Sequence, residues 1–354
     1  MPGQIRTAII GFFLTTIAFA VPAVAQPRLF SDDSEIQLLI DAPLNDLVRA
    51  APRSTDPFAA GVTWSGEGGD NARYDIQLSP RGLSRRTRGI CSFPPLRLDF
   101  DQSAMRGTVW RGQNKLKLVT RCRSGANYDQ LIALEMTAYR MFNEITPMSF
   151  RVRPARVTYR DTAGRRREDV QFNFLIEDVT DLARRNDRRA LEVMPEDVTS
   201  DQLDPRAASL VTMFQYMIGN LDWDMTGGVP GEECCHNGAL IAVNAEARTA
   251  IVPAPFDFDM TGFVDPPYAL LPAEVNVSSL RQRVYRGLCR HNDQVPGAIA
   301  HFQARREAIL AVIDGETRIS DARRRTARAY IESFYELIGD PQRVENMIIR
   351  RCRG

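Results

Sequence analysis

The most constraining feature of the sequence is the stretch from 213 to 262, where polar side chains close short apolar runs. The run MFQYMIG leads into a loop that carries Asp222, and Asn237 directly precedes the run GALIAV. A second run, AIVPAPF, ends at Asp257 and Asp259, which lie two apart and so can point the same way on a strand. We therefore expect an acidic loop, a strand, a tight turn and a second strand that ends in acids.

This order of elements is typical of phosphotransferases. In protein kinases one Asp accepts the hydroxyl proton, while an Asn and a second Asp hold Mg²⁺ against the phosphates. Asp222 is accordingly the candidate catalytic base, and Asp224 is an alternative because the same loop offers both. The candidate ligands of Mg²⁺ or Mn²⁺ are Asn237, Asp257 and Asp259.

The motifs in this stretch resemble those of the atypical kinases of the spore coat protein H family, and more distantly the HipA-type toxin kinases. The matching elements are N-x-D at 220–222, HN at 236–237 and D-x-D at 257–259. Upstream, RGLSR at 81–85 is similar to the RGNSxR loop of spore-coat-H-like kinases. The sequence departs from the pattern in the long spacer before HN, which holds two cysteines. It also lacks a G-x-G-x-x-G loop.

The resemblance implies a two-lobed, protein-kinase-like α+β fold, with a small β-rich N-lobe and a mainly helical C-lobe. It places the site in the cleft between the lobes. The expected division is a signal peptide at 1–25, an N-terminal extension at 26–70, the N-lobe at 71–178 and the C-lobe at 179–354.

The resemblance also implies nucleotide-binding residues outside the acidic stretch. Lys115 and Lys117 fall on the same face of one expected strand. We expect Lys117 to grip the phosphates because it sits deeper in the apolar run, and Glu135 on the next helix to pair with it. The candidate cofactor-binding residues are Arg81, Gly82, Ser84, Lys115 and Glu177.

Each of these residues also has a structural interpretation. Strand lysines often protect sheet edges from aggregation, and most helical glutamates beside an apolar stripe are merely exposed. The basic segment RGLSRRTRG can be a solvated hairpin tip, and His236 can be a structural hydrogen-bonding residue.

The expected function is metal-assisted transfer of a phosphoryl group from ATP to a hydroxyl of a protein or small molecule. One alternative is a nucleotide-binding pseudokinase, and another is transfer of AMP. A third is a Ca²⁺-dependent binding protein, because acidic clusters at strand ends also form Ca²⁺ sites. Such a site needs neither the lysine–glutamate pair nor the RGLSR loop. Serine-hydrolase chemistry is disfavoured because the sequence has no G-x-S-x-G elbow.

Charge and targeting signals narrow the class of protein. A formal net charge of +1 argues against a nucleic-acid binder. Arg6, the apolar run AIIGFFLTTIAFAV and the Ala23-Val24-Ala25 site together predict a cleaved signal peptide. An uncleaved anchor is the alternative, but the run is short for a membrane span of about 20 residues. No later segment is suited to crossing a bilayer, so we expect a periplasmic or extracellular protein with no stable membrane span.

Six cysteines in an exported chain predict disulfides, although their connectivity cannot be deduced from the sequence. Adjacent Cys234 and Cys235 are expected to reach distant partners rather than each other. A Cys91–Cys122 bond would staple neighbouring strands. A zinc site at Cys234, Cys235 and His236 is disfavoured, because three consecutive ligands cannot easily surround a tetrahedral ion.

Periodicity predicts the remaining elements. The segment 35–50 reads as a helix, 128–145 as an amphipathic helix, and 151–159 with 170–176 as a hairpin. Asp204-Pro205 marks the start of the helix that leads to the acidic loop. The chain after 297 is expected to be mostly helical.

Overall fold

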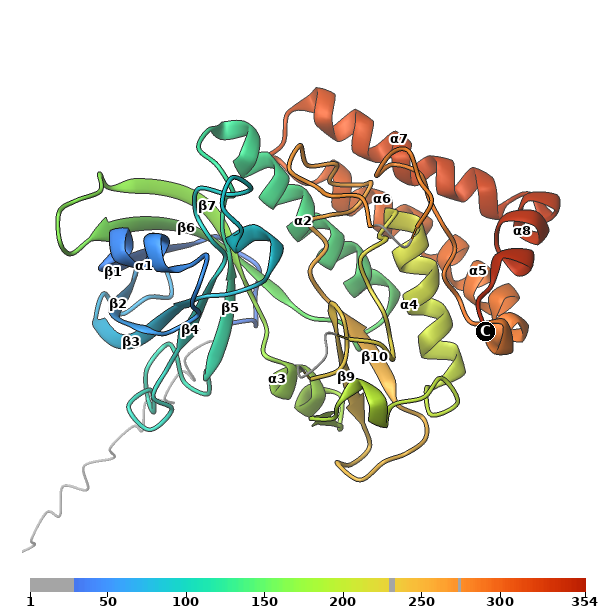
Figure 1. The fold of residues 1–354 in the computed structure, drawn as a ribbon, viewed down its shortest axis with the longest axis horizontal. Coiled ribbons are helices and arrows are strands. Elements are labelled where there is room, and N and C mark those ends of the chain that lie inside the picture. The colour runs from blue at the N-terminus through green and yellow to red at the C-terminus, as the bar shows by residue number, and fades with distance from the viewer. Residues whose placement is uncertain (1–28, 229–232, 273–274) are drawn as a thin grey trace, which may run out of the picture.

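Seven strands form a closed barrel in the computed structural model, which describes residues 29–228, 233–272 and 275–354. The predicted signal peptide at 1–25 lies outside the described residues. The barrel order is β1-β2-β3-β4-β5-β7-β6, and the barrel occupies the left of Figure 1. The strands are β1 (Ile36–Ala42), β2 (Phe58–Ser65), β3 (Arg73–Pro80), β4 (Leu96–Asp99), β5 (Lys115–Val119), β6 (Val152–Asp161) and β7 (Asp169–Ile176).

The expected two-lobed, kinase-like α+β fold is wrong, because the β-rich part is a closed, mixed barrel rather than a small separate lobe. Its closure depends on β1, which pairs antiparallel with β2 and parallel with β6. The helix expected over 35–50 is also wrong in its first half, and only Leu44–Ala50 (α1) is helical. In β1 alternate residues are buried, which is the period of a strand rather than of a helix. The short run of apolar residues was compatible with either period.

The barrel has a hydrophobic core of its own. Inward side chains of the strands fill it, and the rings of Trp64 and Trp110 meet edge to face with centroids 5.8 Å apart. A second, larger core lies among the helices and the small sheet. The barrel is therefore a packed support for the strand ends and loops, with its interior taken up by side chains.

The second sheet has three strands in the order β10-β9-β8. They are β8 (Arg189–Leu191), β9 (Gly238–Ala242) and β10 (Val252–Pro255), and β9 pairs antiparallel with both neighbours. The two strands expected from the acidic stretch are thus confirmed as β9 and β10.

Helices surround this sheet and join it to the barrel (Figure 1). The long helix α2 packs against β7 and α6, and α4 packs against β10. The predicted helix at 128–145, the hairpin now seen as β6 and β7, and the helical C-terminal region are confirmed. The α-helices after α1 are α2 (Ala126–Ile145), α3 (Val179–Arg185), α4 (Pro205–Ile218), α5 (Val295–Ala304), α6 (Arg306–Asp314), α7 (Asp321–Ile338) and α8 (Pro341–Met347). Short 3₁₀ turns are η1 (Ser84–Arg86), η2 (Pro195–Asp197), η3 (Cys289–Gln294) and η4 (Ile349–Arg351).

Helix α4 begins where its sequence signals predict. The Asp204 carboxylate accepts a hydrogen bond from the Ala207 backbone N–H at 2.8 Å, and Pro205 occupies the first turn. Gly219 ends the helix with φ 64°, in the left-handed region that glycine tolerates. The chain then turns directly into the loop that carries Asp222.

Three disulfides are present: Cys91–Cys122, Cys234–Cys235 and Cys289–Cys352. The first is the expected staple. The expectation that Cys234 and Cys235 reach distant partners is wrong, since they bond to each other. Three disulfides are compatible with an exported protein. Within the described ranges, no helix has the length and apolar character needed to cross a membrane.

Ile40→Ala tests whether barrel closure supports the fold. Ile40 is fully buried on β1, so the truncation should lower the free energy of unfolding by about 2–5 kcal/mol. Chemical denaturation followed by far-UV circular dichroism measures this change. Gln37→Ala, at an exposed position of the same strand, should change stability by less than about 0.5 kcal/mol. Equal effects of the two substitutions would contradict a buried role for β1.

Candidate functional site

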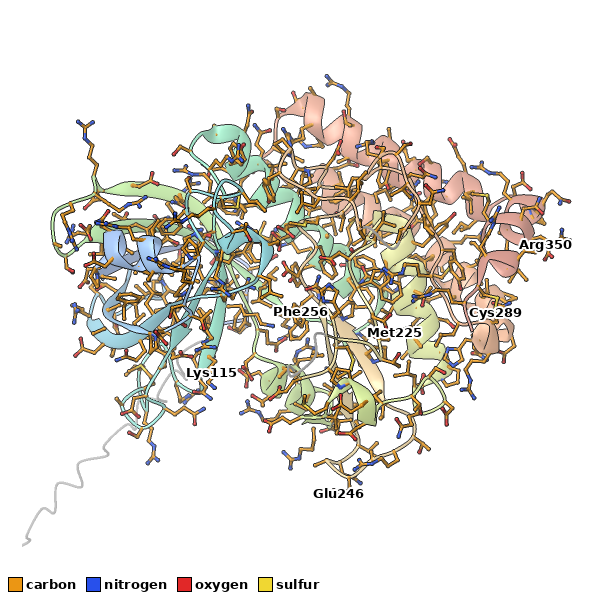
Figure 2. The ribbon with its side chains drawn as sticks, in the orientation of Figure 1. Lys115, Met225, Glu246, Phe256, Cys289 and Arg350 are labelled. Atoms are coloured by element: carbon orange, nitrogen blue, oxygen red, sulfur yellow. A yellow bond between two sulfur atoms is a disulfide. The ribbon has the colours of Figure 1, made fainter. Side chains whose placement is uncertain are left out.

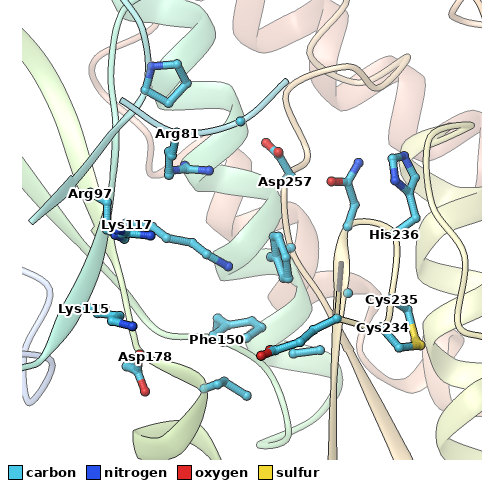
Figure 3. A pocket seen from close by; sticks show the side chains of 18 of the residues that line it. Arg81, Arg97, Lys115, Lys117, Phe150, Asp178, Cys234, Cys235, His236 and Asp257 are labelled. Atoms are coloured by element: carbon cyan, nitrogen blue, oxygen red, sulfur yellow. A yellow bond between two sulfur atoms is a disulfide. The ribbon is translucent and has the colours of Figure 1, made fainter. Parts of the chain in front are cut away.

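A cavity of about 630 Å³ lies between the barrel and the second sheet. Its barrel wall is basic and is formed by Arg81, Arg97, Lys115 and Lys117. Figure 2 shows Lys115 on the barrel side and Phe256 on the side of the second sheet. In the close-up of Figure 3, Arg81 and Lys117 point across the cavity toward the wall that carries Asp257.

The opposite wall is acidic and comes from loops at the ends of α4, β9 and β10. The cavity brings together all of the predicted site residues except Glu135. Residues that line the cavity are Arg81, Gly82, Ser84, Lys115, Lys117, Glu177, Asp222, Asn237, Asp257 and Asp259. Glu135 is buried on α2 behind the cavity. The alternative acid Asp224 does not line it, and its carboxylate accepts hydrogen bonds from the backbone of Thr226 and Gly227.

Lys117 lies against an aromatic ring. Its Nζ is 3.4 Å from the centroid of the Phe256 ring, which is a cation–π contact. Burial, with the nearby charge of Arg81, lowers the pKa of the Lys117 amine to about 8. The expected ion pair with Glu135 is not formed, because no salt bridge among the described residues joins the two side chains. Among the carboxylates, Asp257 instead has the strongest electrostatic effect on Lys117, and its charge raises the pKa of the amine.

Glu135 is only 1% exposed, and neither of its carboxylate oxygens has a hydrogen-bond partner in the described structure. Burial raises its pKa well above the ordinary value, and the charges of Asp259 and Asp257 raise it further. Such a group is costly to bury as an anion unless a cation compensates it. The Glu135 carboxylate therefore interacts electrostatically with the acidic wall, through Asp259 and Asp257.

Asp259 is held by a buried guanidinium. Arg85 lies 3.7 Å from its carboxylate, and the Tyr268 hydroxyl donates to it at 3.5 Å. Burial, followed by the charge of Asp257, raises the pKa of Asp259 to about 7, and Arg85 opposes this shift. The two aspartates of the D-x-D motif thus have different environments, although both line the cavity.

Backbone geometry sets the direction of two candidate ligands. Asn237 has φ 54° and Asp257 has φ 64°, in the left-handed region that Asn and Asp visit more readily than most residues. The Asp257 backbone N–H donates to the Tyr139 hydroxyl at 2.8 Å, which ties it to α2. Residues in this region cluster at functional sites.

Asp222 is held by its neighbours in the acidic loop. His236 Nε2 lies 2.6 Å from one carboxylate oxygen, and Asn237 Nδ2 donates to the other at 3.1 Å. The hydrogen bond to Asp222 raises the pKa of His236. The Asp222 backbone N–H donates to Asn220 Oδ1 at 2.9 Å. Asn220 is buried and donates to Gln215, so the first residue of N-x-D anchors the loop to α4.

Glu177 and Gly82 border the cavity in different ways. The Glu177 carboxylate pairs with Arg185 at 2.9 Å and accepts from the Arg151 backbone N–H at 3.0 Å. The Glu177 carboxylate is thus already engaged by contacts within the protein. Gly82 has φ 77°, and a Cβ built there meets nothing within 4 Å. This glycine therefore serves the backbone turn above the cavity.

Sequence reasoning missed Phe256 and Arg97 as lining residues, and it named His236 in the HN motif only with a structural interpretation beside it. Phe256 could have been found, because it precedes Asp257 in the chain. Arg97 had no such signal. It reaches the cavity because β4 pairs with β5, opposite Lys117 in the register.

The Cys234–Cys235 disulfide also lines the cavity. A backbone hydrogen bond from Cys235 N–H to Gly238 O, at 3.0 Å, closes the turn that carries His236 and Asn237. Because the two sulfur atoms are bonded to each other, they are not available to hold zinc. The disfavoured zinc site at this position is therefore absent from the described structure.

The donor set of the acidic wall fits a hard cation. The described residues contain no group of three or more His, Cys, Asp or Glu side chains that could hold a metal by themselves. Carboxylate and amide oxygens are nevertheless present, and the unpartnered Glu135 carboxylate adds negative charge behind them. Mg²⁺ commonly takes one or two carboxylates and completes its coordination with phosphate oxygens and water.

No protein-family model matches the chain, and no curated protein matches its sequence. The resemblance to spore-coat-H-like kinases therefore rests on the motifs alone.

The lowered pKa of Lys117 can be measured directly, because Lys115 and Lys117 are the only lysines in the sequence. After reductive methylation with ¹³C-formaldehyde, NMR titration should give a Lys117 pKa of about 8. Arg81→Gln should raise it by on the order of one pH unit, because a nearby positive charge disfavours the ammonium form. Asp257→Asn should lower it, because a negative charge that favours the ammonium is removed. A Lys117 pKa near 10.5 in all three proteins would contradict the buried, charge-coupled position.

Proposed function

We propose that the chain is an exported phosphotransferase that moves a phosphoryl group from ATP to a hydroxyl of a protein or small-molecule acceptor. The observation that carries this proposal is the pairing of a basic wall with an acidic wall across one cavity. The basic wall suits the polyphosphate, and the acidic wall suits a divalent metal and the acceptor hydroxyl. At about 630 Å³ the cavity has the size of a cofactor site.

In this proposal the barrel wall holds the phosphates. Lys117 and Arg81 both point into the cavity, and Arg81 brings the planar guanidinium that binds oxyanions well. The Lys117 amine lies over the Phe256 ring, and the negative charge of Asp257 favours its ammonium form. The 81–85 loop covers the same region. Glu135 cannot serve as the partner of Lys117 without a rearrangement, so Asp257 takes its place.

Asn237, Asp257 and Asp259 would hold Mg²⁺ or Mn²⁺, which when bound supplies neutralisation of charge on the transferring group. Asp222 would orient the acceptor hydroxyl and accept its proton. Its carboxylate is fixed by His236 and Asn237, so little reorganisation is needed when the acceptor binds. His236 would also help stabilise the negative charge of Asp222 before transfer.

A periplasmic or extracellular location is part of the proposal. It is supported by the sequence of residues 1–25 and by the three disulfides.

A thermal-shift titration with ATP and Mn²⁺ or Mg²⁺ tests nucleotide binding. Ligands that bind only the native state raise its melting temperature, so the chain should gain a few degrees with metal and nucleotide together. Asp257→Asn should abolish the metal-dependent part of the shift. Glu246→Gln, an exposed acid away from the cavity, serves as the matched control and should behave like the parent protein.

Asp222→Asn separates binding from chemistry. It should keep the nucleotide shift but lower transfer of radiolabelled phosphate by about 10²–10⁴-fold, because the acceptor loses its proton-accepting group. A shift with Ca²⁺ alone, and none with nucleotide, would overturn the enzyme proposal and favour a Ca²⁺-dependent binding protein. A nucleotide shift without any transfer would favour a pseudokinase.

A further inference from the structure

A second cavity, of about 350 Å³, lies between the end of α1 and the segment 85–94. Neither Asp nor Glu is among the described residues that line it. The lining arginines are Arg49, Arg53, Arg85, Arg86 and Arg88. In a chain whose formal net charge is only +1, this is a local concentration of positive charge.

Three of the five arginines that line this cavity have no carboxylate partner among the described residues. Arg49, Arg53 and Arg88 are exposed and form no ion pair with any residue in the described ranges. Elsewhere arginines commonly pair with carboxylates, as Arg73 does with Asp41 at 2.9 Å. An anion from outside the chain would therefore meet guanidinium groups whose charge is still available.

The other two arginines are already engaged by groups of the protein. Arg86 donates to the carbonyl oxygens of Ala51 at 2.7 Å and Ser54 at 3.4 Å, and so ties the end of α1 to the loop. These carbonyls fix the side chain but carry no full negative charge. Arg85 is 5% exposed, pairs with Asp259 at 3.7 Å and donates to Thr120 O, while its Nε has no hydrogen-bond partner among the described residues. It lines both cavities.

The loop side of the cavity is braced before any ligand arrives. The Cys91–Cys122 disulfide joins it to the segment after β5. The backbone N–H of Ser92 donates to Cys122 O at 2.8 Å, and Arg123 donates to Gly89 O and Ile90 O, each at 2.8 Å. The backbone of this loop is therefore ordered before a ligand binds, which lowers the entropy lost on binding.

We propose that this cavity binds a phosphate monoester or diester anion. Several converging guanidinium groups match an oxyanion with several acceptor oxygens better than a single carboxylate. The volume of about 350 Å³ leaves room for an organic group beside the phosphate, as in a phosphorylated small molecule or a phospholipid headgroup. The site is separate from the proposed nucleotide cavity, with Arg85 as the only lining residue in common among those described.

The test uses the mature chain, with glycerol 1-phosphate as the soluble probe and isothermal titration calorimetry as the readout. The double variant Arg49→Gln/Arg88→Gln should weaken binding by at least about 10-fold, because each removes a charge-assisted hydrogen bond. Arg111→Gln is the matched control, since Arg111 is exposed and also forms no ion pair with a described residue. Lys117→Gln controls for binding in the nucleotide cavity. Both controls should bind within about twofold of the parent protein.

Co-sedimentation with vesicles of equal parts phosphatidylglycerol and phosphatidylcholine distinguishes the sources of the anion. Vesicle binding that is lost in the double variant assigns the site to a lipid headgroup, and glycerol phosphate binding without vesicle binding assigns it to a soluble ester. The proposal is overturned if no saturable binding occurs, if Arg111→Gln weakens binding equally, or if only Lys117→Gln weakens it. Unchanged melting temperatures confirm that the variants fold. Since the double variant leaves the nucleotide cavity intact, failure of this proposal leaves the proposed transfer activity untouched.

Discussion

The parallel pairing of β1 with β6 is the constraint on which the arrangement of the site depends. It closes the seven-stranded barrel, and the closed barrel fixes β4 and β5 with their basic residues toward the second sheet. A closed barrel has no free edge in this region, so the strands cannot slide to relieve the repulsion between Arg81 and Lys117. The cavity therefore keeps its concentrated positive charge even though the protein as a whole is almost neutral.

Like charges repel one another on each wall of the cavity, and the opposite charges on the facing wall compensate this repulsion. Asp259 and Glu135 are buried acids whose pKa values are raised, and Lys117 is a buried amine whose pKa is lowered. The charged form of each group is better solvated in water, so burying these groups lowers the stability of the folded state. That pattern is common where a protein prepares a site for a charged ligand. Arg85 pairs with Asp259 and opposes the rise in its pKa.

The sequence predicted local elements better than their assembly. β9, β10 and the helices α2 and α4 carried clear periodicity or capping signals, and Asp204 and Pro205 begin α4 as expected. β1 was misread because a short apolar run fits both periods, and nothing local reveals that β1 will pair with β6, more than a hundred residues away. The grouping of most predicted site residues around one cavity followed from motif order. The separation of Lys117 from Glu135 could not be predicted from motif order, because it depends on side-chain packing against Phe256.

The near-absence of lysine has a practical consequence. Both lysines lie in β5, so a lysine-specific protease can cut the chain only within one barrel strand. Cleavage there requires that strand to leave its two neighbours, β4 and β7. Digestion by such a protease thus reports local opening of the barrel at the wall of the cavity, and any ligand that holds this wall in place would slow it.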